Sequence, residues 1–109
     1  MVYRVSLTAQ ARDDIADVFA YIVRAGAAES AGKWVDRIEA EIFSLDEMPR
    51  RCPVAPESEK FGIEIRQLIF GKRTGTYRII FRVDEGSQDV HILTIRHTSR
   101  DEIKLEDIY

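Results

Sequence analysis

The residues of this chain whose type and spacing could do chemistry are arginines set on a β-strand pattern. The stretch GTYRIIFRVD, residues 75–84, alternates apolar and other side chains with the two-residue period of a strand. One face would be apolar, and the other would carry Arg78 and Arg82, about 13 Å apart at the usual strand rise. A guanidinium group holds a phosphate or a carboxylate through two parallel hydrogen bonds. The pattern therefore raises the question of what this second face meets.

Further cations lie close to this stretch in the sequence. Lys72 and Arg73 occupy the expected turn before it, and His97 follows the end of the last strand pattern. We predict that an open sheet face gathers arginines into a binding site for an anionic target: Arg66, Arg78, Arg82, Arg96 and Arg100. The alternative is that these are ordinary solvent-facing arginines, which natural sheets also use to protect exposed edges.

Other kinds of chemistry find little support in the sequence. The histidines, His91 and His97, and the single cysteine, Cys52, lack the spacing of metal ligands, so no metal site is predicted. No glycine-rich phosphate loop, paired-carboxylate signature or Ser–His–Asp arrangement is recognisable, and no cofactor is predicted. His97 is the obvious candidate for acid–base chemistry near neutral pH.

The overall composition is typical of a soluble globular protein. The chain has 109 residues, of which 45% are apolar and 32% charged, and we predict one domain over residues 1–109. A single cysteine excludes an internal disulfide and suits a reducing cytosol. No apolar run approaches the roughly 18 residues needed to cross a bilayer. These features predict a cytoplasmic protein without a membrane partner.

Charge is distributed unevenly along the chain. Residues 1–59 carry a net charge of −4, residues 60–100 carry +4, and residues 101–109 carry −3, which gives −3 in all. An asymmetry of this kind concerns partners rather than fold. The basic segment would attract phosphates or an acidic protein surface.

Periodicity predicts which elements hold the arginines in place. A strand is expected over residues 2–7, and Thr8 is expected to cap the following helix. Two helical stretches of apolar residues are separated by Gly26, and the second helix spans about residues 28–47. Prolines 49, 53 and 56 are expected to prevent another helix, leaving an irregular connector of about 15 residues. Strands are then expected over residues 63–70, 76–84 and 89–97.

This order of elements predicts an α+β fold of two layers. The order is β-α-α-β-β-β, with a helical hairpin packed on one face of a mostly antiparallel sheet. The apolar residues of the arginine-bearing strand would then face the helices. Arg78 and Arg82 would stand on the opposite, open face of the sheet.

The chain resembles the RelE/ParE superfamily of toxins from bacterial type II toxin–antitoxin modules. The resemblance rests on the order of elements, on LTAQARDDIADVFAYI, on the tryptophan-bearing helix that ends in SLDEMP, and on EIRQLIFGKRTGTYRIIFRVD and VHILTIRHTSRD. It covers nearly the whole chain. It implies a small cytoplasmic toxin that pairs tightly with a cognate antitoxin in a hetero-oligomer.

Members of the superfamily act on different targets. The resemblance therefore leaves three interpretations open: an RNase, a gyrase inhibitor or an inactive relative. RelE-like members cleave messenger RNA on the ribosome, which would require Arg66, Arg78 and Arg82 as cations and His97, or the terminal Tyr109, as an acid–base group. ParE-like members inhibit DNA gyrase and need no nuclease chemistry. A third reading is an inactive relative that only binds its antitoxin.

The resemblance is closer to the ParE-like members. The second predicted helix carries only Lys33 and Arg37 among acidic residues, and the isoelectric point is about 5.4. Ribosome binding is dominated by phosphate contacts, which an acidic chain serves poorly. The segment IRHTSRD, in which a histidine and an Arg-Asp pair follow the last strand, also resembles the ParE-like ending. We therefore expect DNA gyrase as the target, with the ribosome and messenger RNA as the alternative.

Overall fold

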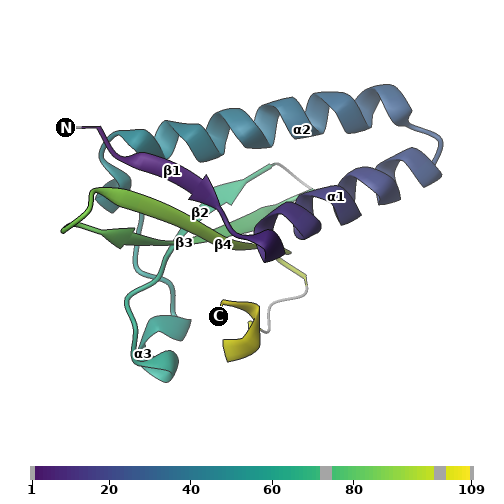
Figure 1. The fold of residues 1–109 in the computed structure, drawn as a ribbon. Coiled ribbons are helices and arrows are strands. Elements are labelled where there is room, and N and C mark those ends of the chain that lie inside the picture. The colour runs from purple at the N-terminus through teal and green to yellow at the C-terminus, as the bar shows by residue number, and fades with distance from the viewer. Residues whose placement is uncertain (1, 72–74, 100–102, 109) are drawn as a thin grey trace.

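The computed structural model describes residues 2–71, 75–99 and 103–108. Within these ranges the chain forms seven helices and strands in the order shown in Figure 1. Their bounds are β1 Arg4–Leu7, α1 Ala9–Arg24, α2 Ala28–Phe43, α3 Glu57–Phe61, β2 Arg66–Phe70, β3 Tyr77–Asp84 and β4 Asp89–His97. Short 3₁₀ turns lie at Ser44–Asp46, Pro49–Arg51 and Leu105–Asp107. No described helix is both long enough and apolar enough to span a membrane.

The α1–α2 hairpin forms where the helical periodicity predicts it. Thr8 caps α1 as expected, because its side-chain oxygen accepts a hydrogen bond from the Ala11 N–H at 3.1 Å. The same hydroxyl donates to the Leu93 carbonyl at 2.9 Å, so the cap also attaches the helix to β4. Gly26 has a positive φ of 85° in the turn between the helices, a conformation that glycine adopts without steric cost.

The sheet has the order β1-β4-β3-β2, with β1 parallel to β4 and the other pairs antiparallel. The prediction of an α+β fold with a helical hairpin on a mostly antiparallel sheet is confirmed. Figure 1 shows both long helices on one side of the sheet, and the α3 and C-terminal segments on the other. The hairpin therefore shields one face, as expected.

A β-bulge in β4 changes which residues face the helices. Ile80 of β3 pairs with Thr94, whereas its neighbour Phe81 pairs with Ile92, so Leu93 is an extra residue in β4. Ile92 and Ile95 consequently both join the core beneath the helices, although they are three positions apart in the strand. A regular strand would place two residues at that spacing on opposite faces.

The second sheet face is covered, contrary to the prediction of an open face. A second apolar cluster lies there and includes Ile65, Ile80, Leu93, Ile103 and Ile108. Ile103 and Ile108 come from the C-terminal segment, and α3 contributes the partly buried Phe61. The open-face prediction is wrong because the sheet strands bear apolar residues on both sides, and those residues require cover from both sides.

The proline-rich connector is more ordered than predicted. It contains the five-residue helix α3, and Val54 forms an isolated antiparallel bridge with Arg66 at the start of β2. The prediction that the prolines prevent another helix is wrong, because Pro56 lies just before α3, where proline needs no N–H donor and its fixed φ suits the helix. Gly62, with a positive φ of 70°, ends α3.

Candidate functional site

Arg78 is almost fully buried beneath α3, with 6% of its surface exposed. Its guanidinium forms a two-bond ion pair with Glu57, with N–O distances of 2.9 and 2.7 Å. The Gln67 side-chain oxygen accepts two further hydrogen bonds from it, at 3.0 and 2.7 Å. The hydrogen bond from Arg78 lowers the pKa of Glu57, so that carboxylate stays ionised well into the acid range. Arg78 therefore fastens α3 to the sheet.

Arg96 lies directly across from Arg78, as its Cα partner on β4. It forms an ion pair with Asp107 of the C-terminal segment at 2.6 Å. The other Asp107 oxygen accepts from the Lys104 backbone N–H at 2.9 Å, which caps the 3₁₀ turn. Two like charges directly opposite one another destabilise a sheet. Here each is neutralised by a carboxylate from a different covering segment.

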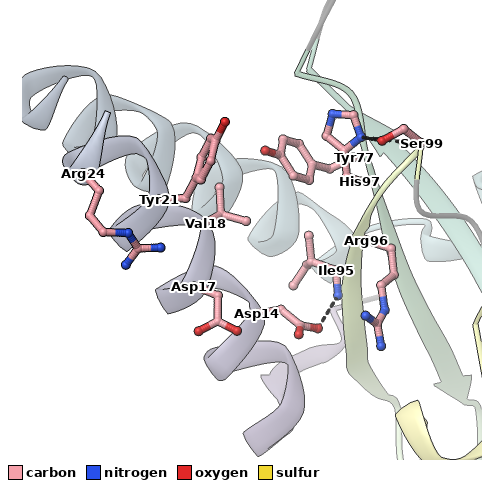
Figure 2. Close-up of a pocket in the computed structure, with 10 residues that line it drawn as sticks. All are labelled: Asp14, Asp17, Val18, Tyr21, Arg24, Tyr77, Ile95, Arg96, His97 and Ser99. Carbon is pink, nitrogen blue, oxygen red and sulfur yellow. Dashed lines mark hydrogen bonds between the residues drawn. The ribbon is translucent and has the colours of Figure 1, made fainter. Parts of the chain in front are cut away.

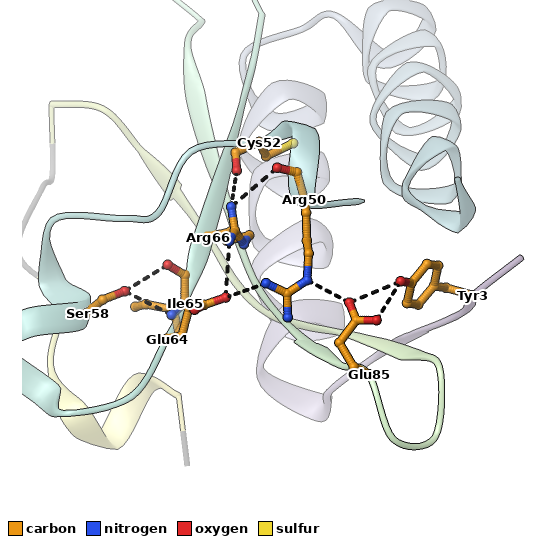
Figure 3. Close-up of polar contacts among 8 residues, drawn as sticks. All are labelled: Tyr3, Arg50, Cys52, Ser58, Glu64, Ile65, Arg66 and Glu85. Carbon is orange, nitrogen blue, oxygen red and sulfur yellow. Dashed lines mark hydrogen bonds and ion pairs between the residues drawn. The ribbon is translucent and has the colours of Figure 1, made fainter. Parts of the chain in front are cut away.

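Arg66 lies on the other face of the sheet, because its register partner is Phe81 of the main core. Its guanidinium donates to the Cys52 carbonyl at 2.7 Å and pairs with Glu64 at 3.2 Å (Figure 3). The prediction that Arg66 shares one surface with Arg78 is therefore wrong. The sequence of β2 has apolar residues at both alternate sets of positions, so periodicity could not assign its faces.

A polar network continues from Arg66 to the start of the chain, as Figure 3 shows. Arg50 contacts Glu64 at 3.4 Å and Glu85 at 2.6 Å, and the Tyr3 hydroxyl donates to Glu85 at 2.8 Å. Hydrogen bonds from Arg50 and Tyr3 lower the pKa of Glu85, and the bond to Glu85 raises the pKa of Tyr3. The network joins the connector, β2 and the β3–β4 turn to Tyr3, the residue before β1.

Arg82 is the exposed member of the predicted arginine set among the residues that the structure describes. It lies across from His91 on β4. Arg100, Lys72 and Arg73 fall outside the described residues, as does Tyr109. The predicted five-arginine surface therefore reduces to one exposed arginine, two arginines in ion pairs beneath covering segments, and one on the opposite face.

His97 is on the helix-facing side of the sheet and Arg78 on the other, whereas Arg96, next to His97 in β4, lines the same pocket as His97 between α1 and the end of β4. The register partner of His97 is Tyr77, and the two rings pack edge to face with their centroids 5.1 Å apart. The Nδ1 atom of His97 accepts a hydrogen bond from the Ser99 backbone N–H at 3.1 Å. The Ser99 hydroxyl lies 2.6 Å from the same nitrogen, the contact that Figure 2 shows.

Of the arginines proposed as catalytic partners of His97, Arg78 and Arg82 lie on the opposite face, because successive residues of a strand point to opposite faces. Arg66 lies on the same face, but it pairs with Phe81, four residues along β3 from the register partner of His97, about 13 Å at the usual strand rise.

The residues that sequence reasoning missed are the acidic partners of these arginines. Glu57 and Asp107 each lie in an acidic segment that flanks the basic one. The uneven distribution of charge along the chain was the signal that could have pointed to these partners. Part of the acidic charge forms ion pairs with the basic segment of the same molecule. Asp14 was also missed: it is 8% exposed and accepts hydrogen bonds from Gln10, from the Thr94 hydroxyl and from the Ile95 N–H at 2.9 Å. It ties α1 to the β4 bulge.

Neither a metal site nor a reactive thiol is apparent in the described part of the chain. No group of three or more histidine, cysteine, aspartate or glutamate side chains there is arranged to hold a metal ion. Cys52 is buried, and burial raises the pKa of its thiol, which disfavours the reactive thiolate.

Comparison with known families decides the relationship. The family described as the ParE toxin of the type II toxin–antitoxin system parDE matches residues 5–102. The chain belongs to this family. A comparison with curated proteins found no match in sequence.

Solved structures of related toxins share the fold. The chromosomal ParDE toxin–antitoxin system of P. aeruginosa aligns with a TM-score of 0.70 and 22% identity, covering 88% of this chain and 96% of that one. A double arginine-to-alanine mutant of the E. coli toxin RelE in its free state aligns with a TM-score of 0.62 and 11% identity, covering 93% and 88%. The RelBE2 toxin–antitoxin complex of Mycobacterium tuberculosis aligns with a TM-score of 0.52 and 23% identity, covering 89% and 99%. At these identities the likeness establishes the fold alone.

Proposed function

We propose that this ParE-family toxin is neutralised by a cognate antitoxin and acts by inhibiting DNA gyrase, without cleaving RNA. The antitoxin partnership is supported by the family match and by the toxin–antitoxin complexes among the structural neighbours. The choice of target depends on the geometry of the candidate site.

The separation of His97 from Arg78 across the sheet is the main observation that favours gyrase over messenger RNA as the target. Cleavage of RNA by its own 2′-hydroxyl requires a proton acceptor, a proton donor and cations that converge on one phosphate. Arg78 and Arg96 are held in ion pairs, and Arg78 lies on one face of the sheet while His97 packs against Tyr77 on the other. Such an arrangement suits a protein that acts by binding rather than by catalysis.

The net charge supports the same conclusion. At −3 the chain repels the phosphate backbone of RNA at long range, and the cations within its basic segment are partly neutralised internally. A protein target recognised through a small exposed surface is compatible with this charge.

Two assays on the purified chain separate the two targets. We expect the toxin to inhibit DNA supercoiling by gyrase and to leave transcripts intact in a translation extract. His97→Ala should keep the supercoiling inhibition, with His91→Ala as the matched histidine control. Ribosome-dependent cleavage of transcripts that His97→Ala abolishes in a folded protein would replace the gyrase proposal with the RNase alternative.

Arg82 is the arginine that we propose contacts the target directly. Arg82→Ala should weaken supercoiling inhibition, because its side chain is exposed and its removal leaves the internal ion pairs of Arg78 and Arg96 intact. Arg37→Ala, an exposed arginine on α2, is the control and should have no effect. Equal inhibition by both variants would remove Arg82 from the target surface.

Cells provide a further test of the toxin assignment. Induction of the chain alone should produce filamentation and a DNA-damage response, and co-expression of the antitoxin encoded beside it should restore growth. Abundant and harmless expression of the folded chain without a partner would contradict the toxin assignment.

A further inference from the structure

The pocket between α1 and the end of β4 has a volume of about 550 Å³ and lies beside the last turns of α1. Figure 2 shows Val18 and Tyr21 projecting from α1 toward Ile95 and Tyr77 of the sheet, with His97 beyond Tyr77. Pockets that bury a ligand usually have volumes of about 300–1,000 Å³. Apolar and aromatic groups therefore line a space that can receive a large side chain.

The sheet side of the pocket is held rigidly. The Tyr77 ring packs edge to face against Trp34 at 5.3 Å and against His97 at 5.1 Å, measured between ring centroids. The hydrogen bond from the Ser99 N–H fixes the His97 ring in turn. This wall is preorganised, which lowers the entropy cost of binding.

The helix side of the pocket presents a projecting aromatic ring. Tyr21 is 67% exposed, although tyrosine is a large side chain whose apolar ring is usually at least partly covered. Tyrosines are over-represented among the residues that dominate binding energy in protein interfaces. The residue before it, Ala20, is small, and small side chains at a helix crossing let two helix axes approach to about 8 Å. One surface thus supplies both an exposed ring and a recess lined by aromatic groups.

Two charged residues of α1 flank Tyr21 at the rim of the pocket. Asp17 and Arg24 are both exposed, and neither forms an ion pair with another residue that the structure describes. They are seven residues apart, so each lies about 5 Å along the helix axis from the midpoint between Ala20 and Tyr21. This face of α1 therefore carries an acidic group, an aromatic group and a basic group in that order, with the aromatic group at the centre.

This order of groups is complementary to itself when the helix is turned end for end. If a second α1 lies antiparallel with the same midpoint, position 17 of each helix faces position 24 of the other, and position 21 faces position 20. Each Asp17 then meets an Arg24. A twofold interface requires one surface that fits its own copy, whereas a surface for a different protein needs no such symmetry. The pattern therefore favours a second copy of this chain as the occupant.

We propose that two copies of the free chain associate through this face, with their α1 helices antiparallel about a twofold axis between Ala20 and Tyr21. Each Tyr21 ring lies over Ala20 of the other copy and enters the pocket of that copy, against its Tyr77. Two ion pairs between Asp17 and Arg24 close the rim, one on each side of the axis. The contact involves only two turns of each helix, so we expect a dissociation constant on the order of 10–100 µM. The inference goes beyond the proposed function and requires neither the antitoxin nor gyrase.

Sedimentation equilibrium of the purified chain, at concentrations on both sides of this constant, is the first test. We expect a monomer–dimer equilibrium without larger species, because a twofold interface closes at two copies. Tyr21→Ala should raise the dimer dissociation constant about 30-fold, because each dimer loses two central rings. Phe43→Ala is the matched control: Phe43 is 49% exposed on α2, outside the pocket, and its removal should change the constant less than about 3-fold. A wild-type chain that stays monomeric, or equal effects of the two changes, would overturn the proposal.

Charge exchange tests the antiparallel register. Asp17→Arg and Arg24→Asp should each weaken self-association about 10-fold, because each places like charges opposite one another at both ends of the contact. The variant with both changes should dimerise like the wild type, because its charges only trade places across the axis. Asp13→Arg is the control, since position 13 lies beyond the end of the other α1 in this register. A double variant no better than the single ones would refute the register.

A mixture of the two single variants gives an independent readout. Asp17→Arg and Arg24→Asp, each poor at self-association, should together form a heterodimer with two restored ion pairs. Thermal denaturation of each variant checks that it is folded. If a wild-type dimer persists in all these variants, it forms through another face and the proposal is wrong. If Tyr21→Ala leaves self-association unchanged but abolishes antitoxin binding or gyrase inhibition, the face belongs to that partner and the proposal is also wrong. Because no partner is present in the sedimentation assay, a failed gyrase assay would leave the dimer result standing.

Discussion

Replacing Glu57 with glutamine removes the carboxylate that neutralises Arg78 beneath α3. The substitution keeps the size of the side chain and one oxygen acceptor, but it leaves a positive charge that is only 6% exposed. Gln67 remains as an acceptor for two of the guanidinium hydrogen bonds. We therefore expect the variant to fold, with α3 held less firmly against the sheet.

The magnitude follows from burial. Removing one partner of a fully buried ion pair costs about 3–5 kcal/mol. The Glu57 side chain is 18% exposed, and a five-residue helix can move to admit water to Arg78. We expect a loss of roughly 2–3 kcal/mol in the free energy of unfolding, which for a chain of 109 residues lowers Tm by about 10 °C.

Urea and thermal denaturation at neutral pH measure this loss, and Glu59→Gln is the matched control. Glu59 lies on the same short helix, is exposed, and forms no ion pair with another described residue, so its replacement should change stability by less than about 0.5 kcal/mol. A Glu57→Gln variant as stable as Glu59→Gln would show that Arg78 does not depend on this carboxylate.

The same pair predicts a pH dependence with a definite sign. The folded-state pKa of Glu57 is lowered, chiefly by the hydrogen bond from Arg78. Its contribution is therefore fully present above the pKa of the unfolded chain and is lost as pH falls through the folded value. The stability difference between wild type and Glu57→Gln should shrink below about pH 4.5, the ordinary value for glutamate. A difference that grew on acidification would refute the assignment.

Three further changes test other parts of the fold by urea or thermal denaturation. Asp14→Ala leaves the buried Ile95 N–H and the Thr94 hydroxyl without an acceptor and should cost about 2–4 kcal/mol in unfolding free energy, whereas Asp13→Ala should cost little. Ile103→Ala should also cost about 2–4 kcal/mol in unfolding free energy, because Ile103 is 1% exposed in the second apolar cluster. Leu105→Ala, at a half-exposed position, is the control. If Ile103→Ala lost no more stability than Leu105→Ala, the cluster would add no stability. Glu85→Gln breaks solvent-exposed contacts and should shift Tm by less than about 2 °C, and a larger shift at high salt would contradict this reading of the network.

Much of the fold of this protein could be predicted from local sequence patterns. Helical spacing of apolar residues predicted the α1–α2 hairpin, and Thr8 was recognised as the cap of α1. Two-residue alternation correctly placed Tyr77, Ile79 and Phe81 of β3 toward the helices. These features depend on neighbours within a turn or a strand, so a short stretch of sequence contains their physical cause.

The candidate site was less predictable because its partners are distant in sequence. Arg78 meets Glu57 from 21 residues away, and Arg96 meets Asp107 from a segment that has no strong pattern of its own. In the sequence, both carboxylates could be recognised only as members of the acidic segments that flank the basic one. Neither interpretation of Arg78 and Arg96 matches the structure, because both are held in ion pairs beneath covering segments and form neither an open binding surface nor ordinary solvent-facing residues.

By itself, the sequence determined the order of the two long helices and the four strands, the helix-facing side of β3, and the family. Only the tertiary structure decided the faces of β2 and β4 and the exposure of the arginines. The extra residue Leu93 shifts the alternation of β4, and a mixed apolar pattern in β2 left the side of Arg66 open. Periodicity reports which face of an element avoids water, whereas the pairing of a buried charge depends on which distant segment closes over it.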